Sequence, residues 1–164
     1  MWLSRSWTTR PRRPSEASDA YTFVDRDRFQ ERIDAGGFLE WAEFLGHLYG
    51  TPLPDAPPGH DVVLEIDLQG ARQVKERDPD ALVVLLVPPS PEVQRHRLRR
   101  RGDDAAEVDR RIAKGAEEMR LGRELTPFVV VNDEVDRAVS EVAGILDIHR
   151  NRPSDPPASH RGGA

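Results

Sequence analysis

The sequence contains no cysteine, so it offers neither a disulfide framework nor a thiolate metal site. Long apolar runs are also absent. The longest, Ala81 to Val87, ends at Pro88 and falls far short of the roughly 20 residues that a membrane span needs. Residues Met1 to Arg5 have neither the charged nor the apolar region of a secretory signal. We therefore expect a single cytosolic domain in this chain of 164 residues.

Lysine is scarce, because only Lys75 and Lys114 are lysines among 24 basic residues. A GC-rich genome is one explanation of this bias. The other is chemical, since guanidinium groups grip phosphate or carboxylate through two parallel hydrogen bonds. The net charge of −5 argues against a general nucleic-acid-binding surface, so we expect neither nucleic acid nor a membrane as a partner. Two basic clusters stand out: Arg5, Arg10, Arg12 and Arg13, and Arg95, Arg97, Arg99, Arg100 and Arg101.

Short apolar runs alternate with helical patterns through the second half of the chain. The predicted strands are Val62 to Ile66, Ala81 to Val87 and Phe128 to Val131, and the predicted helices are Gln69 to Arg77, one opened by Ser90-Pro91-Glu92, and one from Val135 to Leu146. This alternation predicts an α/β fold, with a mostly parallel sheet and helices on its faces.

Three other segments differ from this pattern. The stretch from Arg95 to Arg123 reads as charged helix with only a narrow apolar stripe, which favours a mobile element. Extended segments at Tyr21 to Val24 and Phe38 to Trp41 flank a helix from Asp27 to Ala35, which predicts a small lobe inserted on the core. The tail from about Asn151 is rich in Pro, Gly and Ser, so we expect residues 151–164 to be a disordered extension.

Two acids lie at the end of a predicted strand. Glu65 and Asp67 end the run that begins at Val62, and open α/β sheets bind ligands at the carboxyl ends of their strands. This placement favours a role in chemistry. The alternative is that the two acids cap a helix or pair with arginines.

The basic clusters allow two interpretations each. Arg10 and Arg13 can clamp a phosphate dianion or can lie on a solvated loop, while Tyr21 and Tyr49 can donate to the same phosphate or pack in the core. The cluster from Arg95 to Arg101 can close over a polyphosphate, or it can be a solvated helix face. The five histidines have no metal-ligand spacing, and no Ser-His-Asp arrangement is evident.

Taken in order, several motifs resemble guanylate kinase, from residue 3 to about 148. They are Ser4 to Pro14 (SRSWTTRPRRP), Tyr21 to Val24, Phe38 to Ala42 (FLEWA), Tyr49-Gly50-Thr51, Leu64 to Gly70 (LEIDLQG), Arg97 to Gly102 and Val130 to Asp133. The resemblance implies a P-loop-kinase-like α/β fold within residues 1–150. It also implies ATP and GMP as substrates, Mg²⁺ as cofactor, and transfer of the ATP γ-phosphate to GMP.

The resemblance also implies a role for individual residues. The residues placed on the GMP phosphate are Arg10, Arg13, Tyr21 and Tyr49, and those placed around guanine are Ser6, Glu40, Thr51 and Asp67. Glu65 would hold a Mg²⁺-bound water, and Asn132 would contact adenine. The catalytic arginines would be Arg97, Arg101 and Arg111. Residues 21–51 would form a GMP-binding lobe, and residues 97–123 a lid that closes over the phosphates.

One motif of the family is missing from the sequence. No G-x-x-x-x-G-K-[S/T] occurs in it, so we expect the family's first strand, P-loop and first helix to be absent and the neighbouring strands to keep unpaired edges. The leading interpretation is a start codon assigned too late. The others are a non-catalytic GMP-binding or protein-interaction module, and a transferase with another phosphate acceptor. For the chain as it stands we predict little or no activity and poor folding.

Overall fold

The computed structural model describes residues 1–14 and 16–151, so the predicted tail lies outside the described residues beyond Asn151. The strands are β1 Trp2–Leu3, β2 Trp7–Thr8, β3 Thr22–Phe23, β4 Phe38–Phe44, β5 His47–Pro52, β6 Val62–Val63, β7 Leu85–Val87 and β8 Val129–Val131. The helices are α1 Arg26–Asp34, α2 Leu68–Arg77, α3 Pro91–Arg100, α4 Ala105–Leu125 and α5 Val135–Arg150. This order of elements matches the predicted α/β pattern.

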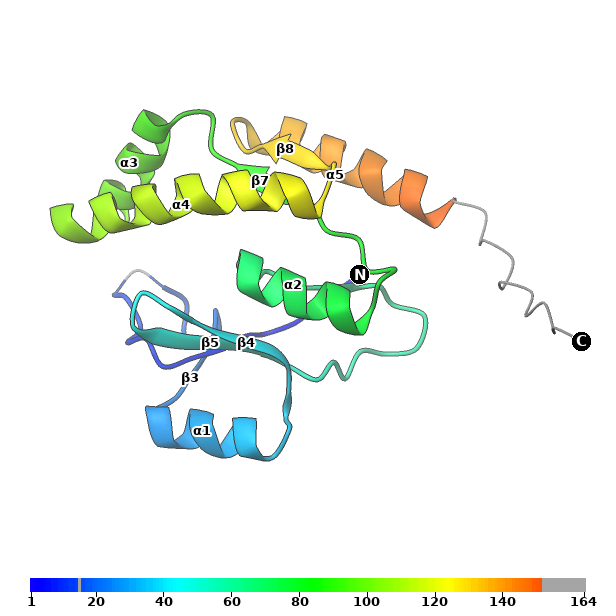
Figure 1. Ribbon diagram of the computed structural model, residues 1–164, viewed down its shortest axis with the longest axis horizontal. Helices are drawn as coiled ribbons and strands as arrows, with labels where there is room; N and C mark the ends of the chain where they lie inside the picture. The colour runs from blue at the N-terminus through cyan, green and yellow to red at the C-terminus, as the bar shows by residue number, and fades with distance from the viewer. Residues whose placement is uncertain (15, 152–164) are drawn as a thin grey trace, which may run out of the picture.

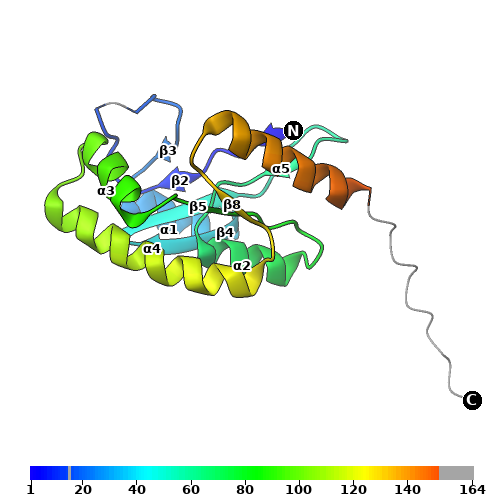
Figure 2. The ribbon, with the colours of Figure 1, turned by 90° about the horizontal axis from the view of Figure 1, so that it is seen from above.

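The molecule has two layers in the view of Figure 1. The lower layer holds what we call the lobe, residues 7–52, in which strands β3-β2-β5-β4 form a mixed sheet covered by α1. The upper layer holds the β7–β8 pair, α5, and what we call the arm, helices α3 and α4. Figures 1 and 2 both place the arm over the sheet of the lobe, and α2 lies between the two layers.

The remaining strands pair in parallel, as the sequence predicts. They form two separate pairs, β1 with β6 and β7 with β8, rather than one continuous sheet. Within the described residues no ladder joins β6 to β7, so each of these strands keeps an unpaired edge. The strand predicted from Val62 to Ile66 is only two residues long in the structure, because β1 provides hydrogen-bonding partners only for Val62 and Val63.

Local sequence signals explain where several helices begin and end. The Ser90 hydroxyl accepts a hydrogen bond from the Val93 amide at the start of α3, and Asp104 caps α4 through the Glu107 amide at 2.8 Å. Gly102 lies between them with φ +92°, in the left-handed region that glycine adopts readily. The predicted charged stretch is therefore two helices with a break at Gly102.

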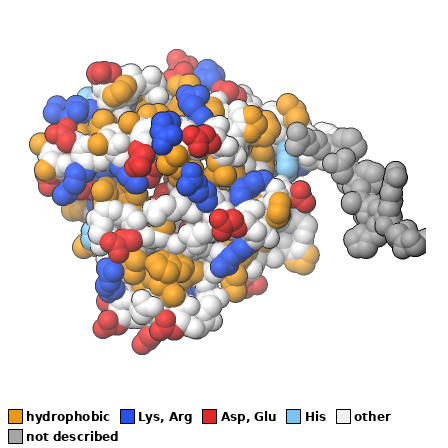
Figure 3. Space-filling model, viewed as in Figure 1, with side chains coloured by type: hydrophobic (Ala, Val, Ile, Leu, Met, Phe, Trp, Pro, Cys, Tyr) orange, Lys and Arg blue, Asp and Glu red, His pale blue; other side chains and the backbone are white. Residues whose placement is uncertain are grey.

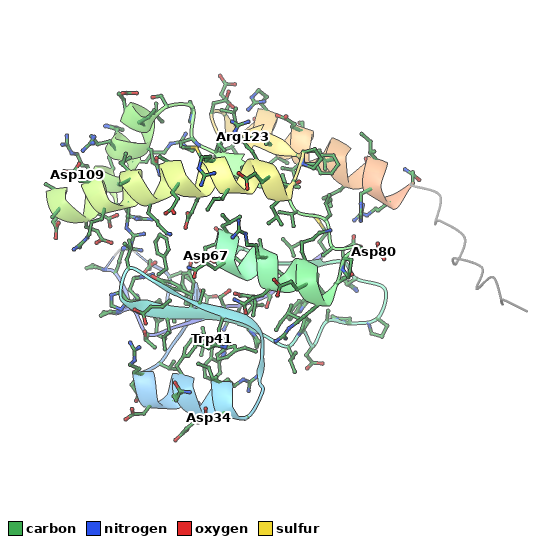
Figure 4. The ribbon with its side chains drawn as sticks, in the orientation of Figure 1. Asp34, Trp41, Asp67, Asp80, Asp109 and Arg123 are labelled. Atoms are coloured by element: carbon green, nitrogen blue, oxygen red, sulfur yellow. The ribbon has the colours of Figure 1, made fainter. Side chains whose placement is uncertain are left out.

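A buried apolar cluster lies in the lobe. Phe29, Phe38 and Leu48 form a buried cluster, in which the rings of Phe29 and Phe38 stack with centroids 4.6 Å apart. Trp7 packs edge-on against Phe38 at 5.8 Å. Trp41, labelled on the lobe in Figure 4, is 40% exposed. Hydrophobic side chains gather on this face of the lobe in the same view in Figure 3. The cluster supports strands β4 and β5, which carry several of the candidate site residues.

Candidate functional site

A pocket of about 250 Å³ lies between the lobe, the arm and the start of α2, a volume just below the roughly 300–1,000 Å³ of most small-molecule sites. Predicted site residues that line it are Ser6, Arg10, Arg13, Tyr21, Glu40, Tyr49, Glu65, Asp67, Arg101 and Arg111. The sequence reasoning did not single out Ala42, Phe44, Ile66 and Glu118, which also line it. Residues far apart in the sequence therefore meet here. We call the part of the pocket around Arg10 and Tyr21 the basic end, and the part where Glu40 and Asp67 meet at Gly70 the acidic end. Glu65 is a carboxylate outside the acidic end, because its charge acts on Tyr21.

Glu40 is the central carboxylate of the acidic end. It lines the pocket from β4 together with Ala42, two residues along, because alternate side chains of a strand share a face. The register shift between Phe38 and Glu40 places Phe38 on the opposite face, where it stacks on Phe29. Its Oε1 accepts a hydrogen bond from the backbone amide of Thr51 at 2.9 Å. Burial raises the pKa of Glu40, although the hydrogen bonds from Thr51 oppose the shift. Glu40 is only 5% exposed, so its carboxylate is largely shielded from water.

The start of α2 holds this acidic end together. Asp67 caps the helix by accepting a hydrogen bond from the Gly70 amide at 2.9 Å, and Figure 4 shows it between the lobe and α4. Gly70 leaves room for Glu40, because a Cβ at this position would overlap Glu40 Oε2 and lie 2.9 Å from Glu40 Cδ, so a larger residue would displace the Glu40 carboxylate. Ser6 and Thr51 complete this end, with their hydroxyl oxygens 3.5 Å apart.

Arg10 anchors the basic end and is 8% exposed. Its guanidinium donates to both carboxylate oxygens of Glu16, at 2.6 and 2.9 Å, and lies 5.6 Å from the ring centroid of Tyr21. Glu16 also accepts from the Arg13 backbone amide at 2.8 Å. The hydrogen bond from Arg10 is the main reason that the pKa of Glu16 falls to about 2. The pair fixes Arg10 beside Tyr21, whose pKa is raised by burial and by the charge of Glu65.

One carboxylate joins the arm to this basic end. Asp103 has a side chain only 5% exposed, and it pairs with Arg101 at 2.5 Å, with Arg111 at 3.5 Å and with Arg13 at 3.6 Å. Burial opposes its ionisation, but the Arg101 hydrogen bond and the surrounding arginine charges outweigh it, so the pKa of Asp103 is lowered. Arg111 also lies 5.6 Å from the ring centroid of Phe44 in the lobe. These contacts hold two arm arginines over the pocket.

Three predicted residues are not on the lining of this pocket. Arg97 donates from its guanidinium to the backbone oxygen of Asn132 at 2.8 Å, and Asp133 accepts a second bond, at 3.3 Å. The Arg97–Asn132 contact joins α3 to the end of β8. Thr51 is fully buried behind the pocket, where it contacts Glu40 rather than facing the cavity.

The described residues contain neither a cluster of metal-binding side chains nor a membrane-spanning helix. They contain no group of three or more His, Cys, Asp or Glu side chains arranged to hold a metal ion. Glu65, where the chain leaves β6, is the carboxylate that the sequence reasoning assigned to Mg²⁺, and it does line the pocket. No helix in the described part of the chain is both long and apolar enough to cross a membrane.

Comparisons with known proteins identify the family of this chain. The family model "Guanylate kinase" matches residues 3–149. A guanylate kinase from Alkalilimnicola ehrlichii is 47% identical over 156 residues, an alignment that covers 92% of this chain and 76% of the relative. A guanylate kinase from Lactococcus lactis is 46% identical over 155 residues, and the alignment covers 91% of this chain and 75% of that relative. The crystal structure of guanylate kinase from Anaplasma phagocytophilum superposes with a TM-score of 0.73 at 29% identity, covering 92% of this chain and 76% of that one. From the family match and the coverage of these relatives, the chain belongs to the guanylate kinase family.

Proposed function

We propose that the pocket binds GMP, with the phosphate at the arginine end and guanine at the carboxylate end. The function of the family is ATP-dependent phosphorylation of GMP to GDP. The observation that carries the proposal is the division of charge within one cavity: Arg10 and Arg13 line it together with Glu40 and Asp67. A nucleoside monophosphate is complementary to this arrangement, because it has an anionic phosphate at one end and a base at the other.

At the guanine end, Glu40 supplies the discrimination. Guanine presents N1–H and the 2-amino group as neighbouring donors, and a carboxylate accepts both. Adenine has no donor at N1, so AMP would leave a 5% exposed carboxylate without its partner, which costs far more than a lost surface contact. Ser6 and Asp67 supply a further hydroxyl and carboxylate around the base, and Thr51 acts from behind the pocket by holding Glu40 through its backbone amide.

At the phosphate end, Arg10, Arg13, Tyr21 and Tyr49 surround the anion. The two tyrosine rings lie 6.3 Å apart, centroid to centroid, and both line the pocket beside the arginines. Each charge-assisted hydrogen bond to a phosphate contributes about 1.5–3 kcal/mol. Because Glu16 already holds Arg10 in place, little side-chain freedom is lost when the phosphate binds.

The arm supplies the groups for transfer. Arg101 and Arg111 enter the pocket from above the GMP site, where they can neutralise charge on the phosphoryl group as it moves. We propose that Arg97 joins them when ATP is bound, and that Asn132, which Arg97 contacts, meets the adenine. Closing the arm on the lobe would exclude water and align the donor and acceptor phosphates.

Mg²⁺ fits this site with a single protein carboxylate. Magnesium keeps most of its waters and binds through phosphates and one or two carboxylates, so the lack of a larger ligand cluster among the described residues is compatible with it. We propose that Glu65 holds a Mg²⁺-bound water. Once bound, the ion would neutralise charge on the transferring phosphoryl group.

One feature favours a second candidate function, a chain that binds GMP without transferring phosphate. The 164 residues hold no G-x-x-x-x-G-K-[S/T] motif, whose backbone amides and lysine cradle the β- and γ-phosphates of ATP. The two candidates predict the same GMP affinity and differ only in turnover.

The test combines calorimetry with a turnover assay. We expect the chain to bind GMP, and Glu40→Gln to weaken binding roughly 10- to 100-fold because an amide cannot accept both guanine donors. Glu43→Gln is the control, since Glu43 lies on the same strand but is 52% exposed and pairs with Arg26. Equal GMP affinity of Glu40→Gln and wild type would contradict the proposed site. ATP-dependent GDP formation by the chain would exclude the binding-only candidate.

A further inference from the structure

Strand β4 lies at the edge of the lobe sheet, and side chains of α2 occupy its free edge. The sheet order is β3-β2-β5-β4, so β5 pairs with one edge of β4, and in the described part of the chain no strand pairs with the other. An open edge leaves main-chain donors and acceptors in need of partners. Figures 1 and 2 place α2 alongside β4. Three side chains of α2 donate to main-chain carbonyls of β4: Gln69 to Glu43 at 3.2 Å, Gln73 to Trp41 at 2.8 Å, and Arg77 to Phe38 at 3.2 Å.

The spacing of these contacts matches the repeats of the helix and the strand. The three donors are four residues apart in the sequence, so they lie on one stripe of α2, about 6 Å apart along the helix axis. Two residues of a strand span a similar distance, roughly 6.6 Å, and the carbonyls of Glu43 and Trp41 are two residues apart. The third carbonyl, of Phe38, is three residues further, and the extra residue falls where the register of β4 shifts between Phe38 and Glu40. The helix therefore runs antiparallel along the edge of the strand.

Gln73 is the middle member of this stripe, and it pairs with both main-chain groups of one residue. Its Nε2 donates to the Trp41 carbonyl at 2.8 Å, and its Oε1 accepts from the Trp41 amide at 3.3 Å, as a neighbouring strand would. Trp41 directly follows Glu40 in the strand. In the helix, Gln73 comes about one turn after Gly70, where a Cβ would overlap Glu40 Oε2. Gln73 therefore joins β4 to α2 beside the point where Glu40 and Asp67 meet.

We infer that Gln73 is a positioning residue for guanine recognition, which holds Glu40 on β4 opposite Asp67 at the start of α2. The inference rests on the proposed function, because it requires guanine at the acidic end of the pocket. The Glu40 carboxylate must accept two neighbouring donors of the base at once, and hydrogen bonds weaken steeply when their geometry is distorted. About 1 Å of looseness between β4 and α2 is enough to impair such a pairing.

Calorimetry with GMP and the full chain tests this role. Gln73→Met removes both hydrogen bonds to Trp41 while keeping an unbranched side chain of similar length, and we expect it to lower GMP affinity roughly 3- to 10-fold. Gln73→Ala, which has the highest helix propensity, is a second variant that keeps α2 formed and should show the same loss. Gln30→Met is the matched control and should bind GMP as wild type does, because the hydrogen bond from Gln30 to Asp34 stays within α1.

A double-mutant cycle separates positioning from a general structural role. If Gln73 acts through Glu40, Gln73→Met should cost less than about 2-fold in GMP affinity in the Glu40→Gln background, since the carboxylate that it positions is already absent. A full 3- to 10-fold further loss in the double variant would overturn the inference, because independent effects multiply. Equal GMP affinity of Gln73→Met and wild type would overturn it as well. Failure of the wild-type chain to bind GMP would instead overturn the proposed function.

Discussion

Replacing Glu16 with glutamine should remove an acid-sensitive part of the stability of this chain. Glu16 holds Arg10 through two hydrogen bonds, at 2.6 and 2.9 Å, and also accepts from the Arg13 amide. Its pKa is lowered from 4.5 to about 2, chiefly by the hydrogen bond from Arg10, and its side chain is only 19% exposed. The difference between these pKa values corresponds to roughly 3 kcal/mol of unfolding free energy.

The sign of the pH dependence follows from the direction of the shift. A carboxyl whose pKa is lowered by folding contributes its full stabilisation above the unfolded value of 4.5 and loses it as the pH falls through the folded value of about 2. The difference in unfolding free energy between wild type and Glu16→Gln should therefore be roughly 3 kcal/mol at pH 7 and shrink steadily below pH 4.5.

Urea unfolding followed by tryptophan fluorescence at several pH values between 7 and about 3 measures this difference. Glu31→Gln is the control, because Glu31 is an exposed residue on α1 with no ion pair in the described part of the chain. A Glu16→Gln difference that stays constant across this pH range would show that the stabilisation does not depend on the charge of Glu16, contrary to this prediction.

Two further substitutions test how the pocket is assembled. Gly70→Ala should displace the Glu40 carboxylate and weaken GMP binding, measured by calorimetry, at least 10-fold, which is roughly the value of one charged hydrogen bond. Gly144→Ala is the control and should bind GMP normally, because a Cβ there has nothing within 4 Å. Equal GMP affinities of the two variants would contradict this prediction. Asp103→Asn should lower the unfolding free energy by about 1–3 kcal/mol and speed hydrogen exchange of α4 amides, because the link from Arg13 to the arm is lost; unchanged exchange would show that the arm is held by other contacts.

Much of the fold follows from local signals in the sequence. Ser90 followed by Pro91 marks the start of α3, and Gly36, with φ +64°, lies just after the end of α1, where glycine commonly ends a helix. Strand lengths are less predictable, because they depend on a partner that is distant in the sequence. Val62 to Ile66 reads as one strand, yet only Val62 and Val63 find partners, on β1. For the same reason, the division of the parallel strands into two pairs instead of one sheet could not be predicted from the sequence.

The site was predictable only where a motif carried it. Glu40 and Asp67 were assigned by resemblance, and both line the pocket. Asp103 and Glu118 have no local signal, because each looks like one more acid in a charged helical stretch. Their importance depends on burial and on which residues the fold brings near them. Glu16 follows the Arg10 to Arg13 segment closely, and that proximity of opposite charges was the signal available for it.

The uneven charge of the pocket has a consequence for how a nucleotide arrives. A mononucleotide approaching with its phosphate toward Glu40 meets repulsion, whereas one approaching with its phosphate toward Arg10 is attracted, so the field selects an orientation before any hydrogen bond forms. A larger fraction of encounters between nucleotide and protein therefore begins with the phosphate directed toward Arg10. Because dissolved ions screen such fields over about 8 Å at physiological ionic strength, this guidance acts only near the mouth of the pocket and weakens as salt rises.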